Sequence, residues 1–144
     1  MLVSVLGLGL ARVALAQAAP APEEDDEAPG VELVAARAVA LDIEATGVDA
    51  RGELSLVLLE APDRDMPLEL RLEPGPVAVD QDRLGWSAVA DPLALQPRVR
   101  ATFTAPSQPG TYAIEGSVTY WVCSERWCRR KHGRLRWTVP VDPG

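Results

Sequence analysis

Hydrophobic residues recur at every second position over much of the chain after residue 30. This alternation runs through residues 39–43, and it returns at Leu54, Leu56 and Leu58. A period of two is typical of a β-strand that buries one face. No segment shows the three-and-four spacing of apolar residues over about a dozen positions that an amphipathic helix needs. The pattern therefore predicts an all-β protein.

Turn signals rich in proline, glycine and aspartate separate these runs. They recur at residues 46–47, 49–52, 61–63, 73–76, 91–92, 106–110, 131–133 and 142–144. Strand-like runs lie between them, for example residues 67–72, 76–79, 99–104, 112–123 and 134–141. About seven to eight short strands at this spacing predict an immunoglobulin-like antiparallel β-sandwich over residues 31–144.

Residues 1–16 are predicted to be a secretory signal peptide. An apolar run passes into small residues, and Ala14-Leu15-Ala16 has the small-x-small pattern of a cleavage site. The run is shorter than the ~20 apolar residues of a membrane span. We therefore expect an exported protein of the periplasm or cell envelope, with no stable membrane span in the mature chain. A buried or amphipathic N-terminal helix is the alternative interpretation.

Residues 17–30 are predicted to be a flexible linker. Five consecutive acids, residues 23–27, lie between prolines. Like charges repel and proline disfavours helix, so solvated chain is the simplest interpretation, with an acidic interaction tail as the alternative. The formal net charge of the 144 residues is −7, and this run carries much of it. The predicted domain is thus nearly neutral, and nucleic acid is not an expected partner.

The composition excludes several kinds of chemistry. The chain has one histidine, two cysteines and a single lysine, and it has no phosphate-binding or dinucleotide-binding motif. A multi-histidine metal site and a catalytic triad with a spare histidine are therefore absent, and no cofactor is expected. Asp63, Asp65, Asp80 and Asp82 fall in polar turns, where solvation accounts for their charge. A hydrolase or group-transfer enzyme is accordingly disfavoured.

The two cysteines are the candidate site. Cys123 ends one predicted strand, and Cys128 follows four residues later in or near the hairpin connection to the last strand. Residues five apart across such a bend can form a disulfide, and an exported protein keeps such a pair oxidised. One interpretation is a structural staple, because so small a ring contributes only about 2 kcal/mol through loop entropy.

A second interpretation is a redox-active pair. Six of the 14 basic residues lie close to the cysteines, and cationic neighbours stabilise a thiolate. The candidate thiolate-stabilising or docking residues are Arg126, Arg129, Arg130 and Lys131, and Trp121 and Trp127 are candidates to shield the bond from solvent. As a docking surface, the basic cluster would suit an acidic protein or anionic lipid. The arginines at 134 and 136 are expected on the outward face of the last strand, and Trp137 in the core.

A third interpretation adds His132 to form Cys-x4-Cys-x3-His, a set of ligands that suits copper or zinc. A structural zinc site takes four ligands, and the chain has no further cysteine or histidine to complete it. No metal is therefore included in the predicted site, although a three-coordinate copper site or a site shared between chains stays open.

The C-terminal third has a Pro-Gly-Thr-Tyr turn at residues 109–112, the strand SVTYWVCSERWC at 117–128 and the closing strand RLRWTVPVD at 134–142. In these features it resembles the N-terminal periplasmic domain of the bacterial thiol:disulfide interchange protein DsbD. The layout matches over residues 38–142, with specific residues confined to 110–128. The resemblance implies an immunoglobulin-like sandwich in which Cys123 and Cys128 take electrons from a membrane donor and relay them to envelope proteins, so that the partner is a periplasmic or membrane redox protein. The alternative is a non-catalytic envelope binding or assembly module with a purely structural disulfide.

Overall fold

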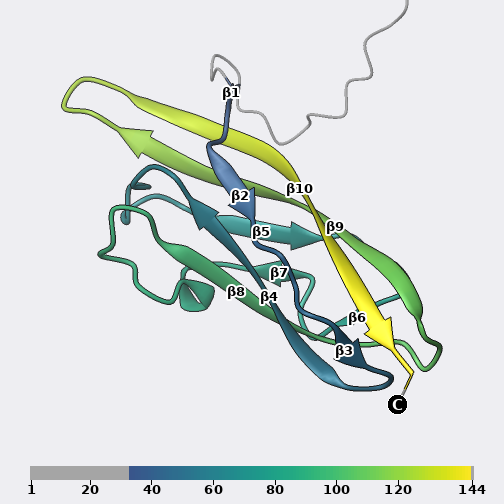
Figure 1. The fold of residues 1–144 in the computed structure, drawn as a ribbon. Helices are drawn as coiled ribbons and strands as arrows, with labels where there is room; N and C mark the ends of the chain where they lie inside the picture. Colours follow the sequence, from purple (N-terminus) through teal and green to yellow (C-terminus); the bar gives the residue numbers. More distant parts are fainter. Residues whose placement is uncertain (1–32, 144) are drawn as a thin grey trace, which may run out of the picture.

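Two β-sheets packed face to face form the part of the chain that the computed structural model describes, residues 33–143 (Figure 1). The predicted all-β, immunoglobulin-like sandwich is confirmed. Within these residues the helical content is one 3₁₀ turn, η1 (Trp86–Ala88). The predicted signal peptide and linker lie outside the described residues.

The first sheet has six strands in the order β1-β10-β9-β5-β7, and β3 also pairs with β10. Its members are β1 (Leu33–Ala35), β3 (Thr46–Gly47), β5 (Glu69–Leu72), β7 (Arg83–Leu84), β9 (Gly110–Cys123) and β10 (Cys128–Asp142). The second sheet has four strands in the order β2-β4-β8-β6. Its members are β2 (Ala38–Ala40), β4 (Arg51–Leu58), β6 (Ala78–Val79) and β8 (Arg98–Thr104).

The N-terminal strand changes sheets, and this adds strands to the predicted count. The Ala36 N–H donates to the carbonyl oxygen of His132 in the first sheet, whereas the carbonyl of Arg37 accepts from Leu59 N–H in the second. The start of the described chain is thus divided between β1, which pairs in parallel with β10, and β2, which pairs antiparallel with β4. The described residues contain ten strands rather than seven or eight because this switch and other connections produce strands of only two or three residues.

The predicted turn at residues 131–133 is wrong, because these residues continue β10. Gly133 pairs with Val118 of β9 in an unbroken antiparallel ladder. A Cβ atom at Gly133 would lie 3.0 Å from the Cβ of Ala36, which is tighter than an ordinary contact. The glycine therefore accommodates the close approach of the chain after β1 rather than a reversal of direction.

The core lies between the sheets and is formed by the inward residues of the longer strands. Trp137 is 1% exposed, and its indole Nε1 donates to the carbonyl of Ser55 across the sandwich at 2.8 Å, which confirms its predicted core position. Phe103 is fully buried and its ring covers Gly52. Trp86 belongs to η1 and donates to the carbonyl of Met66, so it ties two connections together.

Candidate functional site: the disulfide hairpin

The β9–β10 hairpin extends beyond the strands that flank it (Figure 1). Strand β5 pairs with β9 only at residues 116–119, and β1 pairs with β10 only at residues 130–132. The last lateral hydrogen bond on the β9 side runs from Asp63 N–H to the carbonyl of Trp121 at 2.7 Å. Residues 122–129 therefore form a two-stranded ribbon without a strand partner on either side among the described residues. Such ribbons are marginally stable in water on their own.

The predicted disulfide joins the two strands at the end of this ribbon. Cys123 and Cys128 are direct cross-strand partners with their Cα atoms 4.0 Å apart. Beyond them, the chain turns within residues 124–127, where Ser124 N–H donates to the carbonyl of Trp127 at 2.7 Å. The Ser124 hydroxyl oxygen accepts from the N–H groups of Arg126 and Trp127, both at 3.2 Å. The covalent bond and the turn together hold the tip closed.

Strand alternation divides the predicted cationic residues between the two faces of the hairpin. Arg130 shares the face of Cys128 and lies opposite Trp121, whereas Arg129 and Lys131 belong to the other face. Lys131 Nζ lies 3.4 Å from Glu60 Oε1, and the two side chains are only 14% and 17% exposed. The charge of Lys131 is thus paired on the core side of the hairpin, away from the disulfide.

Glu60 and Tyr120 complete a polar network around Lys131 that sequence reasoning missed. The hydroxyl of Tyr120 donates to Glu60 Oε2 and accepts from Arg37 N–H at 3.0 Å. Burial raises the pKa of Tyr120 well above its ordinary value, and the hydrogen bond to Glu60 acts in the same direction. The sequence does contain one sign of this network: Tyr120 alternates in phase with Val118, so its side chain faces inward. This network anchors the base of the hairpin to the connection after β4.

Trp127 and Arg129 form the exposed part of the tip. The guanidinium carbon of Arg129 lies 4.5 Å from the centroid of the Trp127 ring, within the range of a cation–π contact. Trp127 is 45% exposed, and Arg126 is exposed in the turn. The shielding role of Trp121 and Trp127 and the thiolate-stabilising role of the four basic residues stay predictions.

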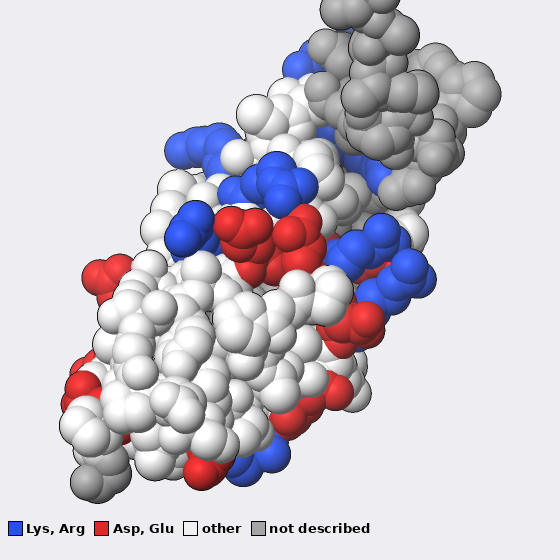
Figure 2. All heavy atoms as spheres, turned by 90° about the vertical axis from the view of Figure 1, so that its right-hand side faces the viewer, with Lys and Arg blue, Asp and Glu red and all other residues white. Residues whose placement is uncertain are grey.

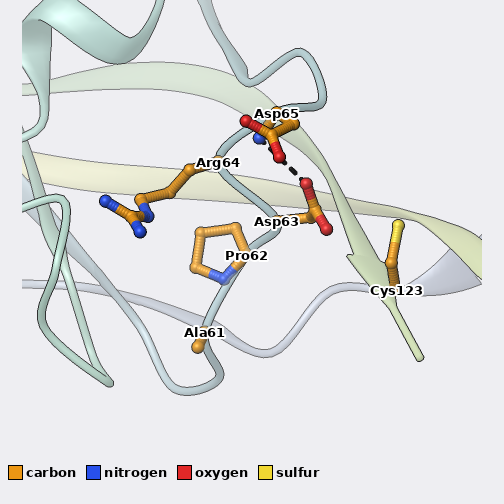
Figure 3. A pocket seen from close by; sticks show the side chains of 6 residues that line it. All are labelled: Ala61, Pro62, Asp63, Arg64, Asp65 and Cys123. Carbon is orange, nitrogen blue, oxygen red and sulfur yellow. Dashed lines mark hydrogen bonds between the residues drawn. The ribbon is translucent and has the colours of Figure 1, made fainter. Parts of the chain in front are cut away.

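A polar cavity of about 330 Å³ lies beside Cys123 and is lined by residues 61–65 (Figure 3). It holds the carboxylates of Asp63 and Asp65, and Asp65 N–H donates to Asp63 Oδ1 at 2.9 Å. Figure 3 shows Asp63 on the side of the loop that faces Cys123, whereas Arg64 points the other way. Negative charge beside a sulfur disfavours a thiolate there. The immediate surroundings of Cys123 are thus acidic, although the sequence near it is basic.

Two other cavities lie away from the disulfide. One of about 310 Å³ includes Asp80 and Thr102, and hydrogen bonds from Thr102 and Arg51 hold the pKa of Asp80 below its ordinary value. The other, of about 280 Å³, lies between residues 40–43 and residues 136–140 of β10.

The exposed face of β10 carries paired charges. Arg134 and Arg136 point outward as predicted, and each forms an ion pair, at 2.8 Å with Glu73 and 3.3 Å with Glu115. On the face shown in Figure 2, positive and negative side chains lie next to one another, and a broad uncharged area adjoins them. On the outward face of β10, the pairing of Arg134 with Glu73 and of Arg136 with Glu115 places both signs of charge side by side.

The Cys-x4-Cys-x3-His set does not form a metal site in this oxidised structure. Both sulfurs are used in the disulfide, and His132 Nδ1 lies 3.1 Å from the hydroxyl oxygen of Thr119. Residues 33–143 contain no group of three or more histidine, cysteine, aspartate or glutamate side chains that could hold a metal ion. In the same residues, no helix is long and apolar enough to cross a membrane.

Fold and site together define an immunoglobulin-like β-sandwich with a projecting, disulfide-closed hairpin. No protein-family model matches the chain, and no curated protein matches its sequence. Among solved structures, the chain is similar to AggA, the major subunit of aggregative adherence fimbriae type I from Escherichia coli, with 6% sequence identity and a TM-score of 0.42. That likeness covers 77% of this chain and 99% of AggA. At this level it carries no argument about function. The comparisons thus support the immunoglobulin-like sandwich, and none of them supports the closer resemblance to the DsbD domain.

Proposed function

We propose that this protein is a non-catalytic binding or assembly module that acts outside the cytoplasm, with the Cys123–Cys128 disulfide as the structural staple of its projecting hairpin. The observation that carries the proposal is the position of the bond. It joins direct cross-strand partners at the end of a ribbon whose last residues lack lateral strands among the described residues. A covalent closure offsets the fraying expected of such a ribbon.

The charges around Cys123 support the same proposal. A reactive disulfide needs a thiolate stabilised by nearby cations. Here Lys131 pairs with Glu60 and Arg129 stacks on Trp127, whereas Asp63 lies on the side of its loop that faces Cys123. Arg130 shares the face of Cys128, so this support applies to Cys123. Electron relay between a membrane donor and envelope proteins stays the alternative prediction, since Cys128 is exposed at the tip.

Export to the periplasm or cell envelope is part of the proposal. A disulfide of this kind persists in oxidising compartments and is rare in the cytosol. The predicted signal peptide at residues 1–16 points the same way.

The pKa of each thiol in the reduced protein tests the proposal. Single-cysteine variants, Cys128→Ser and Cys123→Ser, isolate one thiol each, and the rate of alkylation by iodoacetamide against pH gives its pKa. We expect values at or above the ordinary ~8.5 of a free thiol, with Cys123 the higher because of its carboxylate neighbours.

The matched control is Asp63→Asn/Asp65→Asn in the Cys128→Ser background, which should lower the pKa of Cys123. A thiol that titrates at or below about 7 in either single-cysteine protein would favour disulfide exchange and contradict the staple.

A further inference from the structure

Three of the four large hydrophobic side chains that are exposed within residues 33–143 lie at one end of the sandwich. Leu93 is 71% exposed, Leu95 80% and Trp127 45%, whereas Val39, the fourth, lies on β2 at 44%. Single exposed apolar residues are normal on protein surfaces. Their concentration in the connections at one end indicates an interaction surface.

The sheet registers place the connection before β8 at the same end as the hairpin tip. Strand β1 starts beside Arg130, and the chain continues into β2, whose first residue Ala38 pairs with Leu58 at the end of β4. Strand β8 begins next to that same end of β4, where Arg98 pairs with Val57. Figure 1 accordingly shows the connection into β8 and the hairpin tip on the left-hand side of the molecule.

The apolar side chains at this end protrude. Leu93 N–H donates to Asp91 Oδ1 at 3.3 Å and Ala94 N–H to the Asp91 carbonyl at 3.1 Å, so a turn presents Leu93 and Leu95 to solvent. None of the three cavities described above is lined by these leucines or by Trp127. A protruding apolar side chain suits a deformable apolar surface better than a rigid protein surface, which would need a matching hollow.

The tip adds positive charge to this surface. The turn between the cysteines and the residue after it carry Arg126 and Arg129 against one acid, Glu125, and the leucine turn carries Asp91. Arg129 lies against the ring of Trp127. Tryptophan is enriched at the interfacial zone of a bilayer, and each lysine or arginine near an anionic membrane contributes roughly 1 kcal/mol.

We propose that Leu93, Leu95, Arg126, Trp127 and Arg129, hereafter the tip surface, dock this protein on an anionic phospholipid membrane. The two leucines enter below the headgroups, Trp127 lies at the interface, and the two arginines bind lipid phosphates. The inference rests on the proposed function, for which it names the partner. The disulfide then has a further consequence, because it holds Trp127 and Arg129 in the geometry that meets the membrane.

Cosedimentation of the oxidised protein without the predicted signal peptide, residues 17–144, with phospholipid vesicles tests this proposal. Vesicles of phosphatidylcholine, with or without phosphatidylglycerol, are compared at low and high salt. We expect binding to the anionic vesicles that Leu93→Ser/Leu95→Ser weakens about tenfold per leucine. Arg126→Ser/Arg129→Ser should weaken it about fivefold per arginine, and high salt should reproduce that loss.

Val39→Ser is the matched control, since it removes an exposed apolar side chain outside the tip surface and should leave binding unchanged. Every variant keeps residues 17–32, so the acidic linker is the same in all the proteins that are compared. Equal binding by the wild type and the Leu93→Ser/Leu95→Ser variant would overturn the proposal. A wild-type dimer that this variant disrupts, without vesicle binding, would also overturn it and assign the surface to a second copy of the chain.

The two proposals fail separately. Absence of vesicle binding together with ordinary thiol pKa values would remove the lipid partner and leave the structural staple. Vesicle binding together with a strongly acidic thiol would keep the lipid partner and remove the structural staple.

Discussion

Removal of the disulfide should weaken the protein without unfolding it. The variant Cys123→Ala/Cys128→Ala opens a ring whose ends are five residues apart. Loop entropy for so short a ring gives about 2 kcal/mol. Cys128 is exposed and Cys123 is only partly buried, so the alanines leave no cavity in the core. This loss of stability is an upper bound, because fraying of the tip in the folded variant gives back part of the chain entropy that the disulfide removes.

The assay is urea unfolding of the oxidised wild type and the variant, followed by tryptophan fluorescence, which reports on the buried Trp137. We expect a lower midpoint with an unchanged dependence on urea. In thermal unfolding, the melting temperature should fall by about 10 °C for a domain of this size. The reduced wild type serves as the control and should match the variant.

Amide hydrogen exchange locates the effect. In the variant, exchange should accelerate in residues 121–130, while β4 in the second sheet keeps its protection. A loss of more than about 4 kcal/mol, or faster exchange throughout both sheets, would refute the reasoning by showing that the tip supports the core.

Other predictions concern the base of the hairpin and the core. Tyr120→Phe leaves Glu60 without its hydroxyl donor and should cost about 1–3 kcal/mol in urea unfolding; a loss below 0.5 kcal/mol would contradict the network. Because the pKa of Tyr120 is raised on folding, the stability of the wild type should fall as the pH rises above about 10, the pKa of an unfolded tyrosine. Tyr120→Phe should flatten that fall. Parallel plots of stability against pH for the two proteins would show that Tyr120 makes no contribution. Gly52→Ala places a Cβ against the ring of Phe103 and should cost about 1–3 kcal/mol. Gly47→Ala, with no atom within 4 Å of the added Cβ, serves as its control, and equal stabilities of the two variants would contradict the packing.

The parts of the fold that the sequence predicted are those that depend on local alternation. Leu54, Leu56 and Leu58 are fully buried on one face of β4, and Trp137 is buried while its neighbour Arg136 is exposed. A period of two determines these positions wherever one face of a strand is covered. The same local reasoning located the cysteines at the end of the hairpin.

What the sequence did not predict depends on contacts between distant residues. The switch of sheets between Ala36 and Arg37 follows from hydrogen bonds to His132 and Leu59, which no local pattern reveals. Local sequence predicts a turn at Gly133, whereas the close approach of Ala36, which is distant in the sequence, is what favours glycine there.

The site shows the same division. The run of basic residues is plain in the sequence, but strand alternation and distant carboxylates determine where each charge lies. Lys131 turns toward the core side and meets Glu60, and Cys123 lies beside Asp63. Basic sequence near a cysteine is therefore a weak guide to the charge at its sulfur.

The reduction potential of the Cys123–Cys128 bond tests the central claim most directly. The protein is equilibrated in a series of glutathione redox buffers, and the reduced fraction is read after alkylation. A structural staple predicts a potential below about −300 mV, so the bond resists reduction by glutathione. A potential above about −250 mV would contradict the account and favour disulfide exchange.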